Sequence, residues 1–136
     1  MDITDDDRVA NLDEAECWEL LRSQELGRLA FTLAGETHIV PINFAVDGQT
    51  LLFNTAPGEK LLSIALGTSI AFEVDEVGDS EARSVVVRGS MRRLEEDEAH
   101  RAEQVHLRPW IATEKYEVLE LTPSVVTGRW FRLDRG

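Results

Sequence analysis

The sequence predicts an α+β fold that is mostly β, with antiparallel strands closing into a barrel flanked by short helices. Apolar and polar residues alternate over several short segments, which is typical of strands with one buried face. Tight turns such as Asp47-Gly48 separate these segments, and regular helical crossovers between them are lacking. Strands joined by tight turns favour antiparallel pairing. The length of 136 residues predicts a single domain over residues 1–136.

The start of the chain is expected to be a flexible acidic lead over residues 1–11 that precedes a helix. Asp13 and Glu16 have the spacing of a capping box, in which each side chain accepts a hydrogen bond from the other residue's backbone amide. This motif predicts a helix over residues 14–24, with Gly27 as its left-handed C-terminal cap.

The remaining elements follow from hydrophobic periodicity and from the position of glycine and proline. Two further short helices are predicted over residues 59–66 and 95–104. Pro123 is expected to be a hinge between the last two strands, and Pro41 is expected to mark an edge or a bulge. The predicted strands are 28–33, 38–46, 51–55, 69–77, 83–94, 116–121 and 125–133.

The charge of the chain argues against nucleic acid as a partner. With 26 acidic and 14 basic residues, the formal net charge is −12, so the average field repels polyanions and anionic lipid surfaces. A local anion site remains compatible with this charge. Four arginines cluster in the second half of the sequence and are candidates for it: Arg83, Arg88, Arg92 and Arg93.

The first residues are acidic rather than basic, and no apolar run approaches the length of about 20 residues that spans a bilayer. We therefore expect a cytoplasmic protein without a membrane partner. The single cysteine, Cys17, has no second thiol for a disulfide or a metal pair, and we expect it to be buried on the first helix.

A candidate anion site lies where the third predicted strand gives way to a helix. Thr55 offers a hydroxyl at the strand end, the following helix start offers free backbone amides, and Lys60 offers a positive charge in the first turn. This combination is what a phosphate monoester needs. The alternative is an ordinary strand-to-helix turn with a solvated lysine.

From His38 to Leu94 the order of features resembles the pyridoxamine 5′-phosphate oxidase-like family of FMN-binding split barrels. The short members similar to nitroimidazole-resistance proteins are the nearest in pattern. The resemblance is carried by Pro41-Ile42-Asn43-Phe44, by Phe53-Asn54-Thr55, by Lys60 and by the strand that begins at Arg83-Ser84. It implies a split β-barrel of six to seven antiparallel strands that holds FMN. The cofactor contacts implied are Val40, Pro41, Ile42, Asn43, Phe53, Thr55, Lys60 and Ser84.

Two residues near the end of the chain are further candidates for flavin binding. Trp130 and Arg132 would reach a flavin across a dimer interface, where aromatic and arginine side chains are enriched; a core position is the alternative for Trp130. A homodimer is expected because an open barrel of this size leaves strand edges and apolar surface for a twofold partner to cover.

Two departures from the family pattern bear on activity. Glu59 stands before Lys60, where related proteins often carry a second basic residue, and the C-terminal arginine and histidine pair of the vitamin B6 oxidases is missing. We therefore expect an FMN-dependent oxidoreductase that acts on a small-molecule acceptor other than vitamin B6. A deazaflavin-dependent reductase and a non-catalytic binding or sensing module are the alternatives. No catalytic residues and no metal site are assigned from the sequence.

Overall fold

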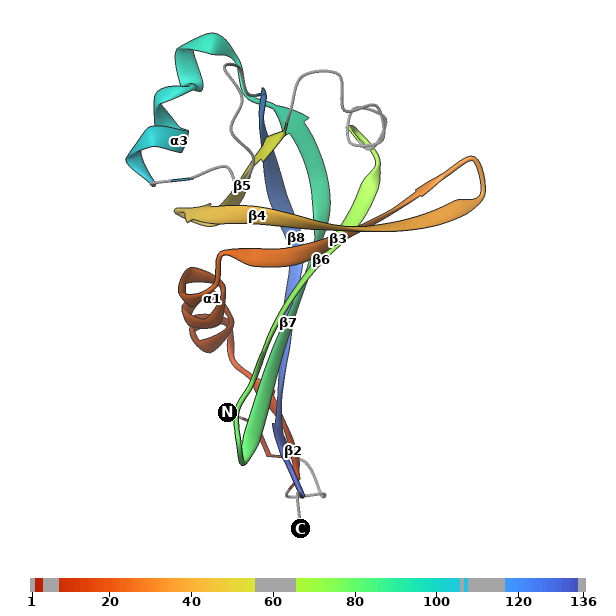
Figure 1. Ribbon diagram of the computed structural model, residues 1–136, viewed down its shortest axis with the longest axis vertical. Coiled ribbons are helices and arrows are strands. Elements are labelled where there is room, and N and C mark those ends of the chain that lie inside the picture. The colour runs from red at the N-terminus through yellow and green to blue at the C-terminus, as the bar shows by residue number, and fades with distance from the viewer. Residues whose placement is uncertain (1, 4–7, 56–65, 106, 108–116, 135–136) are drawn as a thin grey trace.

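The computed structural model describes residues 2–3, 8–55, 66–105, 107 and 117–134. It confirms the mostly β architecture, and every pair of neighbouring strands is antiparallel (Figure 1). None of the described helices is long and apolar enough to cross a membrane. The elements are β1 (Asp2–Ile3), β2 (Val9–Leu12), α1 (Glu14–Ser23), β3 (Leu26–Leu33), β4 (Glu36–Asp47), β5 (Thr50–Thr55), β6 (Ser69–Val77), β7 (Glu81–Arg93), the 3₁₀ helix η1 (Glu96–Glu98), α3 (His100–Gln104) and β8 (Glu117–Arg132).

Strands β3 to β8 form a closed ring. The strand order is β1-β2-β8-β5-β4-β3-β6-β7, and β7 pairs in addition with β8. One edge of β8 follows β7 over residues 119–132. Its other edge is shared, because residues 117–121 pair with β5 and residues 128–131 pair with β2. The barrel is therefore split where β8 passes from one partner to the other.

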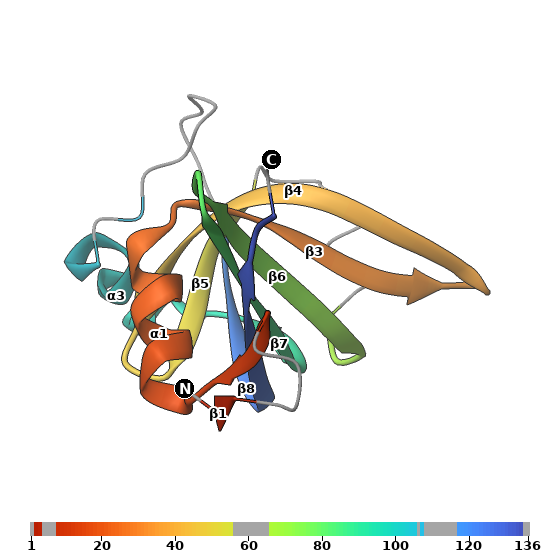
Figure 2. The same ribbon diagram turned by 90° about the horizontal axis from the view of Figure 1, so that it is seen from below.

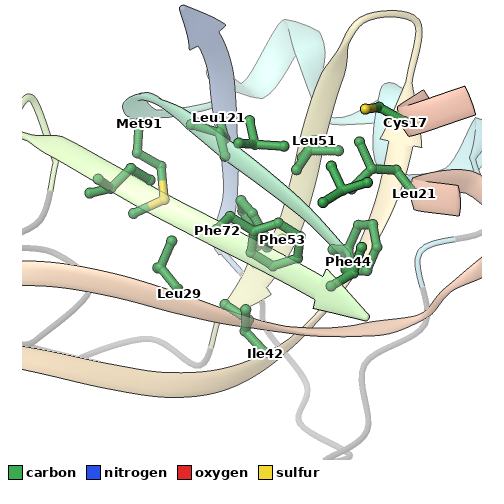
Figure 3. Packing of buried hydrophobic residues seen from close by; sticks show 14 of the residues in the cluster. Cys17, Leu21, Leu29, Ile42, Phe44, Leu51, Phe53, Phe72, Met91 and Leu121 are labelled. Carbon is green, nitrogen blue, oxygen red and sulfur yellow. The ribbon is translucent and has the colours of Figure 1, made fainter. Parts of the chain in front are cut away.

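The barrel interior is apolar and is completed by α1. Phe72 on β6 meets Phe44 and Phe53 edge to face, with ring centroids 4.8 and 5.3 Å apart. Helix α1 adds Leu20 and Leu21, which are fully buried in the same cluster. Figure 3 shows Leu21 in this cluster. In both views the helices lie to one side of the barrel, and the β3–β4 hairpin extends on the other (Figures 1 and 2).

The start of α1 agrees with the sequence prediction. The Asp13 side chain accepts a hydrogen bond from the Glu16 amide at 2.8 Å, and the Asp13 amide donates to the Glu16 carboxylate at 3.1 Å. The prediction for the helix end is wrong. Gly27 is not a left-handed cap but a buried residue of β3, and the capping residue is Gln24 in an extended conformation. A Cβ at Gly27 would lie 2.2 Å from the Phe72 ring, so close packing requires glycine there.

Three other predicted segments differ in the structure. Residues 9–12 form β2 instead of belonging to an unstructured lead, because their backbone pairs with β8. The last two predicted strands are one continuous strand through Pro123. The predicted helix over 95–104 is divided into η1 and α3. The hairpin at Asp47-Gly48 is confirmed, with a Gly48 φ of 61°, whereas residues 59–65 of the predicted helix 59–66 lie outside the described residues.

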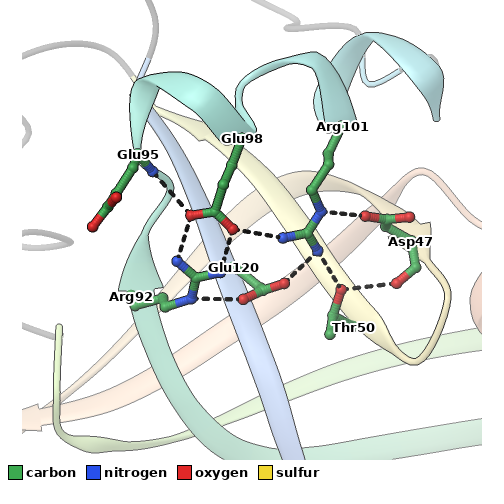
Figure 4. A network of polar contacts seen from close by, with 7 residues as sticks. All are labelled: Asp47, Thr50, Arg92, Glu95, Glu98, Arg101 and Glu120. Atoms are coloured by element: carbon green, nitrogen blue, oxygen red, sulfur yellow. Dashed lines mark hydrogen bonds and ion pairs between the residues drawn. The ribbon is translucent and has the colours of Figure 1, made fainter.

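A network of ion pairs fixes η1 and α3 against the barrel (Figure 4). Glu120 on β8 is 5% exposed, and its carboxylate accepts hydrogen bonds from Arg92 at 2.8 Å and from Arg101 on α3. Arg101 also binds Asp47 at 2.6 Å, at the turn between β4 and β5. Arg92 binds both carboxylate oxygens of Glu98 at 2.7 and 2.8 Å. These bonds connect β4, β7, β8, η1 and α3, with the buried acid Glu120 at the centre.

Within this network the Arg92 guanidinium holds the pKa of Glu98 at about 2, well below its ordinary value of 4.5. The hydrogen bond from the Glu95 amide adds to this effect. A carboxylate whose pKa is lowered by folding stabilises the fold when it is ionised in both the folded and the unfolded state.

Replacement of Gly27 tests its assignment to a packed strand. Gly27→Ala should lower the free energy of unfolding by about 1–3 kcal/mol, because the added Cβ collides with Phe72. Gly27→Asn should cost at least as much, as measured by urea denaturation. Asparagine is accepted at left-handed cap positions, so a better tolerance of asparagine than of alanine would contradict this assignment.

The Glu98 pair predicts a dependence of stability on acid pH. Its contribution should be complete above the ordinary pKa of 4.5 and should disappear as the pH falls to about 2, because Glu98 then becomes protonated. Denaturation midpoints measured across this range should show a shallower loss for Glu98→Gln than for the wild type. Glu96→Gln is the matched control, since Glu96 is exposed in the same turn. An identical profile for Glu98→Gln and the wild type would exclude this role.

Candidate functional site

The outer face of the barrel is formed by side chains of β3, β4, β6, β7 and β8 that point away from the core. On β4, Ile42 and Phe44 are buried, whereas Pro41 is exposed and Asn43 is half-buried between them. On β7, Val85 and Val87 are buried, so the half-buried Ser84 points to the opposite side. Three of the predicted cofactor residues, Pro41, Asn43 and Ser84, are therefore on the outer face.

Three others point into the barrel. Phe53 is fully buried and Ile42 is 7% exposed, and both belong to the core cluster. Val40 is half-buried and packs against the same cluster. The structure thus gives these side chains a packing role, and only their backbone is available to a ligand on the outer face. Period-two alternation is the reason, since neighbouring residues of a strand face opposite sides.

The predicted phosphate site is described in part. Thr55 ends β5 and is 6% exposed, and no residue in the described part of the chain hydrogen-bonds its hydroxyl group. The pairing of Phe44 with Phe53 brings this strand end level with residue 42 of β4. Lys60 lies outside the described residues, so its distance from Thr55 remains a prediction.

The other candidates lie farther along the sheet. Ser84 pairs with Asp75 and Arg129, and strands β3 and β6 separate it from Asn43 on β4. Trp130 packs against the core, and its indole nitrogen donates to Glu81 at 2.9 Å. Arg132 is exposed at the end of β8. One chain therefore does not bring all the predicted residues to a single point.

A charged cluster on the outer face was not anticipated from the sequence. Arg28 on β3 donates to Glu73 at 3.0 Å through Nε, and its terminal nitrogen lies 2.7 Å from Asp75. Burial raises the pKa of Glu73, although the hydrogen bond from Arg28 acts against this shift. The acidic residues alternate on β6, but the pairing of β6 with β3, which creates the cluster, has no local signal in the sequence.

A groove of about 730 Å³ opens on the same face, where the β3–β4 hairpin leaves the barrel. Ala30, Ala71 and Gly89 line it with little side-chain bulk, and Arg88 is its charged residue. Among the described residues, none of those that line it is acidic. Six hydroxyl-bearing residues take part in the lining: Thr32, Thr37, Ser69, Ser90, Thr122 and Ser124.

Comparison with known proteins gives a consistent family. A family model described as pyridoxamine 5′-phosphate oxidase matches residues 13–130. The structure of an FAD-binding protein from Mycobacterium smegmatis is 40% identical, covers 92% of this chain and 100% of its own, and superposes with a TM-score of 0.84. A Corynebacterium glutamicum protein assigned provisionally to the pyridoxamine 5′-phosphate oxidases is 37% identical over 97% of this chain and 100% of its own, also with a TM-score of 0.84.

Another relative resembles the chain in fold alone. A Bacteroides thetaiotaomicron protein, described provisionally as a 5-nitroimidazole antibiotic resistance protein, is 17% identical, covers 93% of this chain and 92% of its own, and has a TM-score of 0.73. This likeness agrees with the resemblance found in the sequence. The match of the family model over most of the chain is decisive: the chain belongs to the pyridoxamine 5′-phosphate oxidase family.

Proposed function

We propose that this chain is a homodimeric flavin-dependent oxidoreductase that acts on a small molecule. The observation that carries the proposal is the open outer face of β4 at Pro41 and Asn43. Beside it, β5 ends at Thr55, whose hydroxyl no described residue hydrogen-bonds. The 40% identity with an FAD-binding protein over 92% of the chain supports a flavin as the ligand. We expect redox chemistry because the chain belongs to the pyridoxamine 5′-phosphate oxidase family.

The residues of β4 and β5 suit the parts of a flavin. Pro41 and Asn43 offer an exposed apolar ring and an amide on one strand, which match the flat ring system and its polar edge. Thr55 offers a hydroxyl donor at the adjacent strand end, and Lys60 is the proposed counter-charge of the phosphate. When bound, the flavin supplies the electron transfer, and the protein supplies position, polarity and shielding from water.

The proposed homodimer follows from what the outer face leaves uncovered. Ile39 is 67% exposed and Val125 is 48% exposed, and both lie on this face. A convex sheet surface covers a planar ligand from one side only, so a second subunit is needed to exclude water from the other. Arg132, exposed at the end of β8, is the candidate contribution of that partner, whereas the Trp130 indole already donates to Glu81.

The proposed flavin could be FMN, FAD or a deazaflavin. The sequence pattern favours FMN, whereas the similar M. smegmatis protein binds FAD, so both nucleotides belong in the test. A deazaflavin with a long anionic tail is less favoured by the charges. Two of the arginines that cluster in the sequence are already neutralised, since Arg83 binds Glu76 at 2.7 Å and Arg92 binds Glu98 and Glu120, which leaves Arg88 for such a tail.

Native purification tests the proposal directly. We expect a yellow protein with a flavin absorption spectrum, a released chromophore that mass spectrometry identifies as FMN or FAD, and a dimer in light scattering. A colourless protein that does not bind either added nucleotide would refute flavin binding. A flavin-loaded protein that no nicotinamide donor reduces would support the alternative of binding without turnover.

Lys60→Ala should weaken flavin affinity at least tenfold, because a charge-assisted bond to phosphate contributes about 1.5–3 kcal/mol. Thr55→Val should weaken it by a smaller factor, since it removes one neutral donor. Fluorescence titration of the flavin-free protein measures both effects. The chain's other lysine provides the control variant, Lys115→Ala. Unchanged affinity in Lys60→Ala would remove Lys60 from the site.

A further inference from the structure

The groove at the base of the β3–β4 hairpin has features of a second binding site. We propose that it binds a small molecule that carries a carboxylate or a phosphate group, with Arg88 as the counter-ion. The residues that line this groove do not include Thr55, and the proposal does not depend on flavin binding.

The groove is open because the local packing keeps its floor free of bulk. Ala30 and Ala71 are paired on β3 and β6, and Ala71 is in turn paired with Arg88. A β-bulge follows Arg88, and a Cβ at Gly89 would lie 2.1 Å from the Thr122 carbonyl oxygen, so this position needs glycine. The volume of about 730 Å³ is within the range of about 300–1,000 Å³ that small-molecule sites occupy.

Arg88 differs from the other arginines of its strand because it has no acidic partner among the described residues. Arg83 binds Glu76 at 2.7 Å, Arg92 binds Glu98 at 2.7 Å, and Arg93 binds Glu117 at 3.3 Å. No carboxylate within the described ranges lies at ion-pair distance from Arg88. Since the chain has 26 acidic residues and a net charge of −12, a groove with one free arginine and no acid is a locally positive site.

The residues around Arg88 keep it available. Its cross-strand neighbours are Ala71 and Val125, neither of which carries a charge. Glu73, two positions from Ala71 on β6, is already bound by Arg28. The Ser124 hydroxyl donates to the Arg88 carbonyl oxygen at 3.1 Å, which fixes the backbone that carries the guanidinium.

Hydroxyl groups complete the donor set. The side chains of Thr32, Ser69, Ser90 and Thr122 are exposed along the groove, and no described residue hydrogen-bonds them. A hydroxyl donates one hydrogen bond, and a guanidinium offers a planar pair of donors that fits carboxylate and phosphate oxygens. An oxyanion at Arg88 would therefore find both a full charge and neutral donors.

The site is distinct from the proposed flavin contacts. Arg88 and Ser84 are four residues apart on β7, a distance of about 13 Å along an extended strand. Thr37, the groove residue on β4, is six residues from Asn43 on the same strand, about 20 Å, and Thr55 ends the neighbouring strand β5 level with residue 42. Loss of a ligand at Arg88 and loss of the flavin can thus be measured separately.

The test is a titration of the purified, isotopically labelled protein with inorganic phosphate and, separately, with succinate, followed by amide NMR. We expect chemical-shift changes at Ser90, Thr122 and Ser124 that saturate with at least one of the two anions. Arg88→Gln should weaken this binding at least tenfold, and Arg88→Lys should retain part of it. Arg22→Gln is the control, since it removes an equal charge from the exposed side of α1.

The outcomes separate this site from the flavin site. Saturation by phosphate alone assigns a phosphate ligand, and saturation by succinate alone assigns a carboxylate. Failure of both anions to shift the groove amides, or equal affinity in Arg88→Gln and the wild type, would overturn the proposal. Shifts confined to Thr55 and its neighbours would also overturn it. Flavin content should be unchanged in Arg88→Gln, so a failure here leaves the proposed flavin function standing.

Discussion

The structure depends on the way in which β8 closes the barrel. One edge of this strand pairs with β7 over residues 119–132, while the other edge pairs first with β5 and then with β2. Pro123 lies between these two stretches and beside the bulge at Arg88 and Gly89. A residue without an amide hydrogen is tolerated at such an interruption, whereas in a fully paired strand it would remove a ladder bond. The change of partner therefore lets one long strand serve both halves of the fold.

This closure also determines where charge and open surface meet. Arg92 lies at the end of β7 that pairs with the start of β8, so it reaches Glu120 on β8 and Glu98 on η1. Arg83, near the other end of β7, reaches Glu76 on β6. Arg88 stands between them in a row formed by Ile39, Ala30, Ala71, Arg88 and Val125, whose other members are all apolar. Acidic side chains thus neutralise the arginines near both ends of β7, whereas Arg88 in the middle of the strand keeps its positive charge.

The sequence was sufficient for features that neighbouring residues determine. The Asp13 and Glu16 capping box and the Asp47-Gly48 hairpin depend on contacts within a few residues, and both were predicted correctly. Strand β2 was missed because all four of its residues pair with β8, which comes from the far end of the chain. Gly27 was misassigned because its reason, the approach of Phe72, is also a long-range contact. The same distinction applies to the site: the resemblance selected a continuous stretch of β4, but the pleat divides that stretch between the core and the outer face.

Shielding from water connects the two sites that we propose on one face. Phe53 and Ile42 fill the barrel interior, so no ligand of flavin size can enter between the strands. Redox chemistry on the outer face therefore requires a cover that the described part of the chain does not provide. A twofold partner placed over the row from Ile39 to Val125 would bury these exposed side chains and would roof the groove at Arg88 at the same time. A bound anion would then lie beside the subunit contact, where burial strengthens its attraction to the guanidinium.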